Sequence, residues 1–191
     1  MSKAVMLSIR PKWCEKIIMG RKTMELRKSV PKLEVPFKCF IYCTSSHPYI
    51  SVKGRNLDRD TARTNTVGRC NGKVIGEFVC DYILQRCEMA NADIAEQQSC
   101  VRREDIYFKY SEEGKHYIYG WHISGLRIYD QPRELTEFRR ACPNSWYCES
   151  CAMYWENNGT CGNESLRIKR PPQSWCYVEA MDGERKDGGD G

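Results

Sequence analysis

Lys22, Glu25 and Arg27 have the residue types and the spacing to bind an anion or to move a proton. They stand in the run from Gly20 to Arg27, which puts four charged residues into eight positions. A lysine desolvated inside a barrel cleft can act as a nucleophile or a base, because loss of water lowers its pKa. Lysine and arginine also bind phosphate groups. The same pattern equally fits a solvated strand edge with one surface ion pair.

The elements around this run must place the three side chains. The apolar run from Ala4 to Ile9 predicts a buried strand, and Pro11 is tolerated in the first turn of a helix that Gly20 ends. The charged run then predicts a second strand. Because side chains alternate in a strand, we expect Glu25 and Arg27 on one face, with Lys22 on the other face or at the edge.

The rest of the chain alternates strand-like runs with two helical segments. Four further strands are predicted, at Phe37 to Thr44, Lys73 to Leu84, His116 to Tyr129 and Gln173 to Glu179. Two helices are predicted, at Asn91 to Ser99 and Arg102 to Tyr110. Strands dominate, and helices serve as crossovers. We therefore predict an α+β fold built on a small closed or nearly closed barrel. The polar, basic stretch from Ser45 to Asn71 is either a nucleic-acid-binding loop or a plain insertion.

Four cysteines late in the chain have the spacing of metal ligands. Cys142, Cys148, Cys151 and Cys161 form the pattern C-x5-C-x2-C-x9-C. Thiolates at such spacing can surround one tetrahedral zinc ion, which with four protein ligands would be structural and not catalytic. An iron–sulfur cluster uses the same ligands, and free thiols or disulfides also remain open.

Charge and hydropathy narrow the class of protein. Residues 1–40 hold ten Lys or Arg against three Glu, a balance that suits a phosphate-binding surface. No apolar run approaches the length of a membrane span, and no signal-peptide pattern precedes the twelve cysteines. We therefore expect a soluble, cytoplasmic protein. The sequence also lacks a glycine-rich phosphate loop and a G-x-S-x-G nucleophile motif.

The order of a short strand, a helix and G-x-K-x-x-E-x-R at the start of the next strand resembles the ASCH domains of the PUA-like superfamily. A second likeness lies in Tyr119-Gly120-Trp121-His122-Ile123, followed by Ile128-Tyr129-Asp130-Gln131-Pro132, which resembles a later barrel strand of that family. The resemblance covers about residues 3–138. It implies a PUA-like small mixed β-barrel over residues 1–180. Residues 139–170 then form a Cys-rich insertion before the last strand, for which the cysteine spacing predicts zinc binding. Residues 181–191 are expected to form a disordered tail.

The resemblance also implies a function. It predicts an RNA or nucleotide-like ligand in a cleft around the motif, with a binding set of Lys12, Lys22, Glu25, Arg27, Trp121 and His122. As an alternative, Lys22 and Glu25 would be the catalytic residues of an amidohydrolase or nuclease acting on modified nucleosides or RNA. One bacterial branch of the family hydrolyses N4-acetylcytidine. Lys22 of this chain matches the motif lysine of that branch, but Glu25 stands where that branch has a threonine. A second alternative is a protein-interaction module in transcription.

Overall fold

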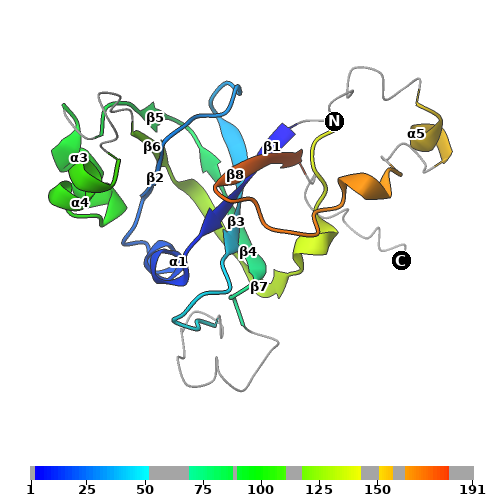
Figure 1. Cartoon of the computed structure of the whole chain (residues 1–191), viewed down its shortest axis with the longest axis horizontal. Helices are drawn as coiled ribbons and strands as arrows, with labels where there is room; N and C mark the ends of the chain where they lie inside the picture. The colour runs from blue at the N-terminus through cyan, green and yellow to red at the C-terminus, as the bar shows by residue number, and fades with distance from the viewer. Residues whose placement is uncertain are drawn as a thin grey trace, which may run out of the picture.

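Strand β1 (Lys3–Ile9) lies inside the larger of two sheets and is apolar on both faces. It pairs in parallel with β3 (Phe37–Cys43) and antiparallel with β8 (Trp175–Glu179). The sheet has the order β7-β4-β3-β1-β8. A strand with partners on both edges and packing on both faces is expected to read as a continuous apolar run, as residues 4–7 do. Figure 1 shows β1 crossing the middle of the molecule.

Strands β4 (Lys73–Cys80) and β7 (Ser124–Arg133) complete the larger sheet. Their ladder is irregular, and a Cβ at Gly76 would collide with the backbone oxygen of Arg127. Glycine is therefore needed where β7 crosses closest to β4.

The smaller sheet has the order β2-β6-β5, formed by β2 (Met24–Arg27), β6 (Tyr119–His122) and β5 (Ile83–Leu84). Only Ile123 separates β6 from β7, so the chain passes directly from one sheet to the other. Helices α3 (Ala92–Ser99) and α4 (Arg103–Tyr110) cover this sheet on one side. Apolar side chains of β2 and both helices pack there, including Met24, Leu26, Ala95 and Ile106.

Helix α1 (Pro11–Ile18) follows β1 after a single residue. Its buried side chains Cys14 and Ile17 join the core on one face of the larger sheet. Gly20 follows with φ +69°, a conformation that favours glycine, and reverses the chain toward β2. The predicted strand, helix and glycine stop are thus confirmed.

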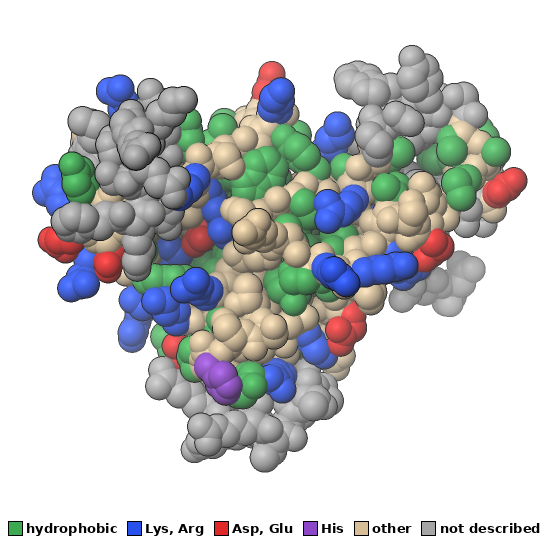
Figure 2. Space-filling view, viewed as in Figure 1, with side chains coloured by type: hydrophobic (Ala, Val, Ile, Leu, Met, Phe, Trp, Pro, Cys, Tyr) green, Lys and Arg blue, Asp and Glu red, His purple; other side chains and the backbone are tan. Residues whose placement is uncertain are grey.

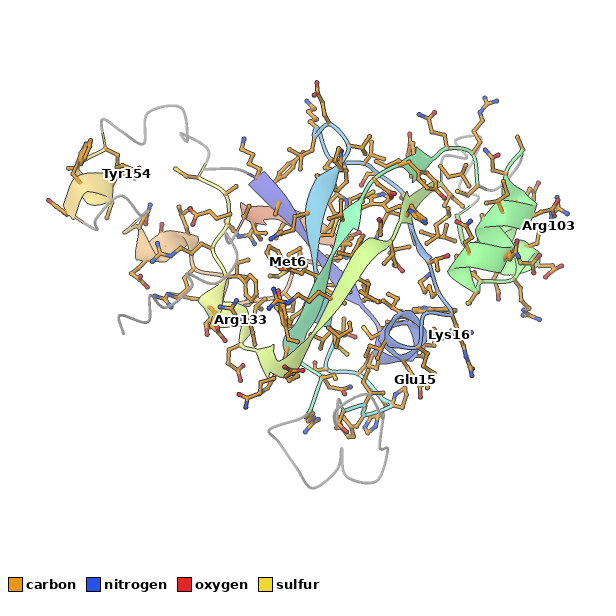
Figure 3. The ribbon with its side chains drawn as sticks, turned by 180° about the vertical axis from the view of Figure 1, so that it is seen from behind. Met6, Glu15, Lys16, Arg103, Arg133 and Tyr154 are labelled. Carbon is orange, nitrogen blue, oxygen red and sulfur yellow. The ribbon has the colours of Figure 1, made fainter. Side chains whose placement is uncertain are left out.

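The other face of the larger sheet is covered by segments from the last third of the chain. Phe138 and Ile168 pack there against Met6 and Phe40, after the short 3-10 helices η1 (Leu135–Glu137) and η3 (Glu164–Leu166). Figure 3 labels Met6 within this core, and it places α4 with Arg103 and α5 (Ala152–Glu156) with Tyr154 at opposite ends of the molecule.

The computed structural model describes residues 3–51, 69–87, 90–110, 118–142, 151–156 and 162–180. The α+β class is confirmed, as are both predicted helices. Closure into a barrel is not seen in these ranges, because their ladders stay in two separate sheets. The predicted strand from Lys73 to Leu84 breaks at residues 81–82, where the chain leaves the larger sheet for the smaller one. The predicted tail, residues 181–191, lies outside the described ranges.

None of the helices in the described ranges is both long enough and apolar enough to cross a membrane.

Candidate ligand-binding site

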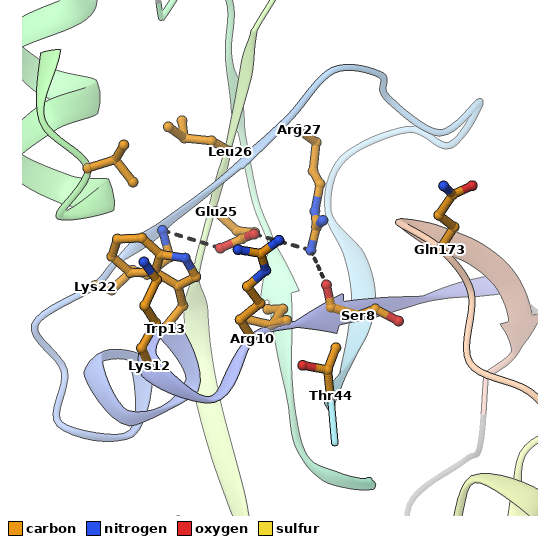
Figure 4. Close-up of a pocket in the computed structure, with 12 residues that line it drawn as sticks. Ser8, Arg10, Lys12, Trp13, Lys22, Glu25, Leu26, Arg27, Thr44 and Gln173 are labelled. Atoms are coloured by element: carbon orange, nitrogen blue, oxygen red, sulfur yellow. Dashed lines mark hydrogen bonds and ion pairs between the residues drawn. The ribbon is translucent and has the colours of Figure 1, made fainter. Parts of the chain in front are cut away.

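A cavity of about 420 Å³ opens where α1, β1 and β2 meet. Figure 4 shows its wall, to which β1, β2 and the segment before β8 all contribute side chains. The lining residues are Ser8, Ile9, Arg10, Lys12, Trp13, Lys22, Glu25, Leu26, Arg27, Thr44, Val101 and Gln173. Four of the predicted ligand-binding residues, Lys12, Lys22, Glu25 and Arg27, are therefore brought together at one cavity.

Lys22 lies in the turn before β2 and is 2% exposed. Its Nζ donates hydrogen bonds to the carbonyl oxygens of Met24, at 2.7 Å, and Ser99, at 2.9 Å. Lys22 therefore ties the start of β2 to the end of α3. It reaches the Glu25 side of the strand, which corrects the expectation that it lies on the opposite face or at the edge. Lys22 precedes β2, so strand alternation does not direct its side chain, and the carbonyls of Met24 and Ser99 hold its Nζ.

Glu25 stands between two cations and is 7% exposed. Its Oε2 lies 3.2 Å from Lys22 Nζ, and its Oε1 lies 3.1 Å from Arg27 Nη2. A buried carboxylate is costly unless it is paired, and these two contacts supply the pairing. The Oε2 atom nevertheless has no hydrogen-bond partner, because the contact with Nζ is an ion pair without hydrogen-bond geometry.

Arg27 bridges the two sheets. Its Nη2 donates to the carbonyl oxygen of Ser8 on β1 at 2.9 Å, and its Nη1 lies 3.5 Å from the hydroxyl of Ser174, just before β8. The Arg27 Nε atom is buried without a partner. As predicted, Glu25 and Arg27 share a face of β2. Their network fills the seam between the sheets (Figure 4).

Arg10 and Lys12 differ from this network because they are exposed. Within the described ranges, neither pairs with an acidic side chain. Trp13 stands between them and the buried network, with Lys12 Nζ 4.6 Å, Lys22 Nζ 5.2 Å and Lys16 Nζ 5.3 Å from the ring centroid. The lining holds four basic side chains and one acidic one, so the cavity is positive. Such an arrangement favours an anion at the mouth.

Trp121 and His122, the other two predicted ligand-binding residues, are not among the residues that line the cavity. Trp121 is fully buried and packs edge-on against Phe37, with ring centroids 5.6 Å apart. It lies directly opposite Glu25 in the antiparallel β2–β6 ladder, so its side chain projects from the same face of the smaller sheet as Glu25 and packs beside the buried network. The sequence motif that contains both residues does not distinguish positions buried in the core from positions that line the cavity.

His122 pairs with a carboxylate outside the cavity. Its Nδ1 lies 2.6 Å from Asp81 Oδ1, and its ring stacks on Tyr82 at 4.4 Å between centroids. Desolvation alone would raise the pKa of Asp81, but the hydrogen bond and charge of His122, with backbone hydrogen bonds, lower it below its usual value. Asp81 and Tyr82 stabilise this histidine at the end of β6, which is an ordinary structural role.

The sequence predictions missed five polar or aromatic residues of the lining. Ser8, Arg10 and Trp13 flank the predicted helix start, so the basic character of this segment could have indicated them. Thr44 and Gln173 come from distant parts of the chain, and no local pattern marks them. Only the pairing of β1 with both β3 and β8 brings them to the cavity.

The arrangement is that of a binding site with a charged floor. Two backbone carbonyls accept hydrogen bonds from the Lys22 ammonium, which are contacts that a protonated lysine makes. A nucleophilic lysine needs an unprotonated amine with its lone pair directed at the substrate. The contacts of Lys22 therefore favour its use as a fixed positive charge.

The predicted metal ligands are only partly described. Cys142 is half-buried and Cys151 is exposed, while Cys148 and Cys161 lie outside the described ranges. Within those ranges, no three His, Cys, Asp or Glu side chains come together as a metal site. The structural zinc stays a prediction, and metal analysis of the full chain, purified without added metal, would test it. One zinc per chain is expected, whereas iron or no metal would contradict it.

Other cysteines behave as buried apolar side chains. Cys14, Cys39 and Cys80 lie in the core, and burial raises the pKa of each thiol. Raised thiol pKa values make these cysteines poor nucleophiles.

Comparisons with known proteins give a likeness of shape. No family model and no curated protein matches the chain. Among solved structures, it is similar to ASCH from Zymomonas mobilis, with 18% identity over 92% of this chain and 87% of that chain and a TM-score of 0.47. A mutant of that protein matches with 16% identity over 93% of this chain and 91% of that chain, with the same TM-score. Both of these solved structures are of ASCH from Zymomonas mobilis.

Proposed function

We propose that the protein binds RNA or a nucleotide-like ligand in the cavity around Lys22, Glu25 and Arg27. The observation that carries this proposal is the division of the cavity into two electrostatic parts. Its mouth has exposed cations without acidic partners among the described residues, and its floor has a buried, paired network with one unsatisfied acceptor. A nucleotide also has two parts, an anionic phosphate and a neutral base and sugar with hydrogen-bond donors.

The phosphate would lie at the mouth. Arg10 and Lys12 are exposed there, and no carboxylate in the described ranges competes for either. Each phosphate that they neutralise would release counterions and add affinity that falls with salt.

The base or the ribose would lie deeper. Glu25 disfavours an anionic group in contact with its own carboxylate, because two negative charges repel each other, and Lys22 and Arg27 are already paired with it. Its Oε2 still lacks a hydrogen bond, so a ligand with an N–H or O–H group would satisfy it after a small movement of the side chain. The half-buried Trp13 ring beside it adds an apolar surface of the kind that bases contact.

One observation favours the enzyme alternative. The two residues predicted to be catalytic, Lys22 and Glu25, are in contact at 3.2 Å on the cavity wall. A mixture of the protein with modified nucleosides or RNA, followed for product in a single turnover, would test amide or phosphodiester cleavage. The hydrogen bonds of Lys22 to two carbonyls weigh against this alternative.

The proposed binding can be tested with charge-matched variants. Affinity for single-stranded RNA and for nucleoside 5′-monophosphates would be measured for the wild type and for Arg10→Ala with Lys12→Ala. The control is Arg102→Ala with Arg103→Ala, which removes the same charge from exposed positions at α4. We expect the cavity-mouth variant to lose about tenfold or more in affinity and the slope of log K against log salt to shrink by about 1.4.

Two results would contradict the proposal. The first is an equal loss of affinity in both double variants, which would mean nonspecific attraction to net charge. The second is the absence of measurable binding by the wild type at low salt.

A further inference from the structure

Three planar side chains gather outside the cavity, on the described segments that precede and follow residues 52–68. The His47 and Tyr49 rings have centroids 4.2 Å apart with a tilt of 57°, and the Arg69 guanidinium carbon lies 4.0 Å from the Tyr49 centroid. His47 is exposed, and Tyr49 and Arg69 are half-buried. These residues are called the His47–Tyr49–Arg69 cluster below.

The backbone that carries the cluster is held in place. Asn71 is buried, and its Oδ1 accepts a hydrogen bond from the Ile50 N–H at 2.9 Å. Its Nδ2 donates to the carbonyl oxygens of Ser46, at 2.7 Å, and Pro48, at 3.0 Å. Ser51 and Arg69 face each other in an antiparallel bridge. One asparagine therefore fixes the loop on which His47 and Tyr49 stand, so the cluster is preorganised.

The cluster lies close to the cavity. Thr44 lines the cavity, its N–H donates to Ile9 at 2.9 Å, and its hydroxyl lies 3.0 Å from that of Ser46. Tyr49 stands five positions after Thr44, which limits the distance between their Cα atoms to about 18 Å even for an extended chain. Ile50 and Cys70, beside the cluster, pack in the same core as Cys14 of α1. Figure 2 shows basic side chains gathered over α1 on the face that also carries this segment.

The positive charge of Arg69 is not neutralised by a carboxylate within the described part of the fold, although its guanidinium lies over the Tyr49 ring. No described carboxylate pairs with Arg69, and its Nε is buried without a hydrogen bond. An exposed imidazole beside a phenol and a guanidinium offers faces on which a base can stack, and such stacking tolerates any base. The unpaired positive charge suits the phosphate that accompanies the base.

We propose that the His47–Tyr49–Arg69 cluster is a second subsite, which binds a flanking nucleotide of a single-stranded RNA whose neighbouring nucleotide occupies the cavity. This inference rests on the proposed function and makes it narrower, since the ligand becomes an RNA strand of several nucleotides and not a free mononucleotide. The spacing between the subsites is within the reach of a few nucleotides.

The test compares ligand lengths. Affinities for nucleoside 5′-monophosphates and for a hexanucleotide of single-stranded RNA would be measured for the wild type and for His47→Ala with Tyr49→Leu. The control is Tyr107→Leu, which removes an exposed tyrosine from α4. We expect the wild type to bind the hexanucleotide at least about tenfold more tightly than the mononucleotide, and the cluster variant to lose about 5- to 100-fold for the hexanucleotide alone.

Unchanged mononucleotide affinity in the cluster variant would show that its cavity is folded. A wild type that binds both probes equally, or a cluster variant that keeps the full hexanucleotide affinity, would overturn the second subsite and leave the proposed function standing. An equal loss for both probes would also overturn it. A wild type that binds neither probe would overturn the proposed function itself.

Discussion

Two acid–base pairs lie on neighbouring strands of the smaller sheet or just beside them, and they differ in burial. Lys22 and Glu25 are almost completely buried at the cavity, whereas in the pair of His122 and Asp81 the side chains are 24% and 41% exposed. Glu25 of the first pair and His122 of the second are both predicted from the sequence to bind ligand. Only the buried pair lines the cavity, although the exposed pair has the shorter contact, 2.6 Å against 3.2 Å.

The difference shows that distance alone does not rank these pairs. Water solvates the charges of the exposed pair whether or not they are in contact, so the pair contributes little to stability. Removing one partner of the buried pair leaves a charge without water, which costs several times more. The two pairs therefore respond differently to substitution, and this difference can be measured.

The largest effect is expected for Lys22→Met, which keeps the length of the side chain and removes its charge. Glu25 would lose one of its two cations, and the carbonyl oxygens of Met24 and Ser99 would lose their donor. We expect the free energy of unfolding to fall by about 3–5 kcal/mol in chemical denaturation. Lys12→Met at the exposed mouth is the matched control, with an expected change within about 0.5 kcal/mol. Equal stability of the two variants would contradict the expectation that a buried charge pair costs more to break than an exposed charge.

A smaller effect on stability, but a clear one on binding, is expected for Glu25→Gln. The free energy of unfolding should fall by about 2 kcal/mol, because Lys22 and Arg27 lose the carboxylate between them. Ligand affinity should also fall, and the loss should persist at high salt, although the protein becomes more basic. Binding that grows tighter at every salt concentration would mean that the cavity acts only as a positive surface.

The smallest effect is expected for Asp81→Asn, and it should depend on pH. The pKa of Asp81 is lowered in the folded protein, so its pairing stabilises the fold above the pKa of the unfolded chain, about 3.9. This stabilisation is lost as the pH falls through the lowered pKa. At pH 7 the variant should lose less than about 1 kcal/mol, and the difference should vanish near pH 2. A larger loss, or one that grows in acid, would mean that the pair is not solvated as described.

Local patterns in the sequence predicted most of the elements that hold the cavity. The apolar run of β1, the proline at the start of α1 and the charged run of β2 each depend on neighbouring residues only, and all three are found. Gly20 adopts the positive φ expected of a helix stop. The shared face of Glu25 and Arg27 follows from strand alternation alone, and it is also found.

The misplaced residues depend on contacts between distant segments. The side chain of Lys22 turns toward Glu25 because Ser99 and Met24 offer it carbonyls, and Ser99 lies 77 positions away. Trp121 has an aromatic side chain of the kind that stacks on bases, but this side chain is buried in the core against Phe37. Gln173 comes to the cavity only through the pairing of β8 with β1. These placements follow from the order of strands in the sheets, which local periodicity does not determine.

The pairing of β1 with β8 also determines at which point in synthesis the sheet and the cavity can be completed. Lys3 lies opposite Glu179, so the first described strand gains its second partner only when the last one has been synthesised. Ser174 and Gln173, which contact Arg27 and line the cavity, arrive at the same moment. During translation, one edge of β1 is therefore open to other chains, and such an edge invites aggregation. The nascent chain has no complete cavity until residues 173–179 are present, so ligand cannot assist folding before then.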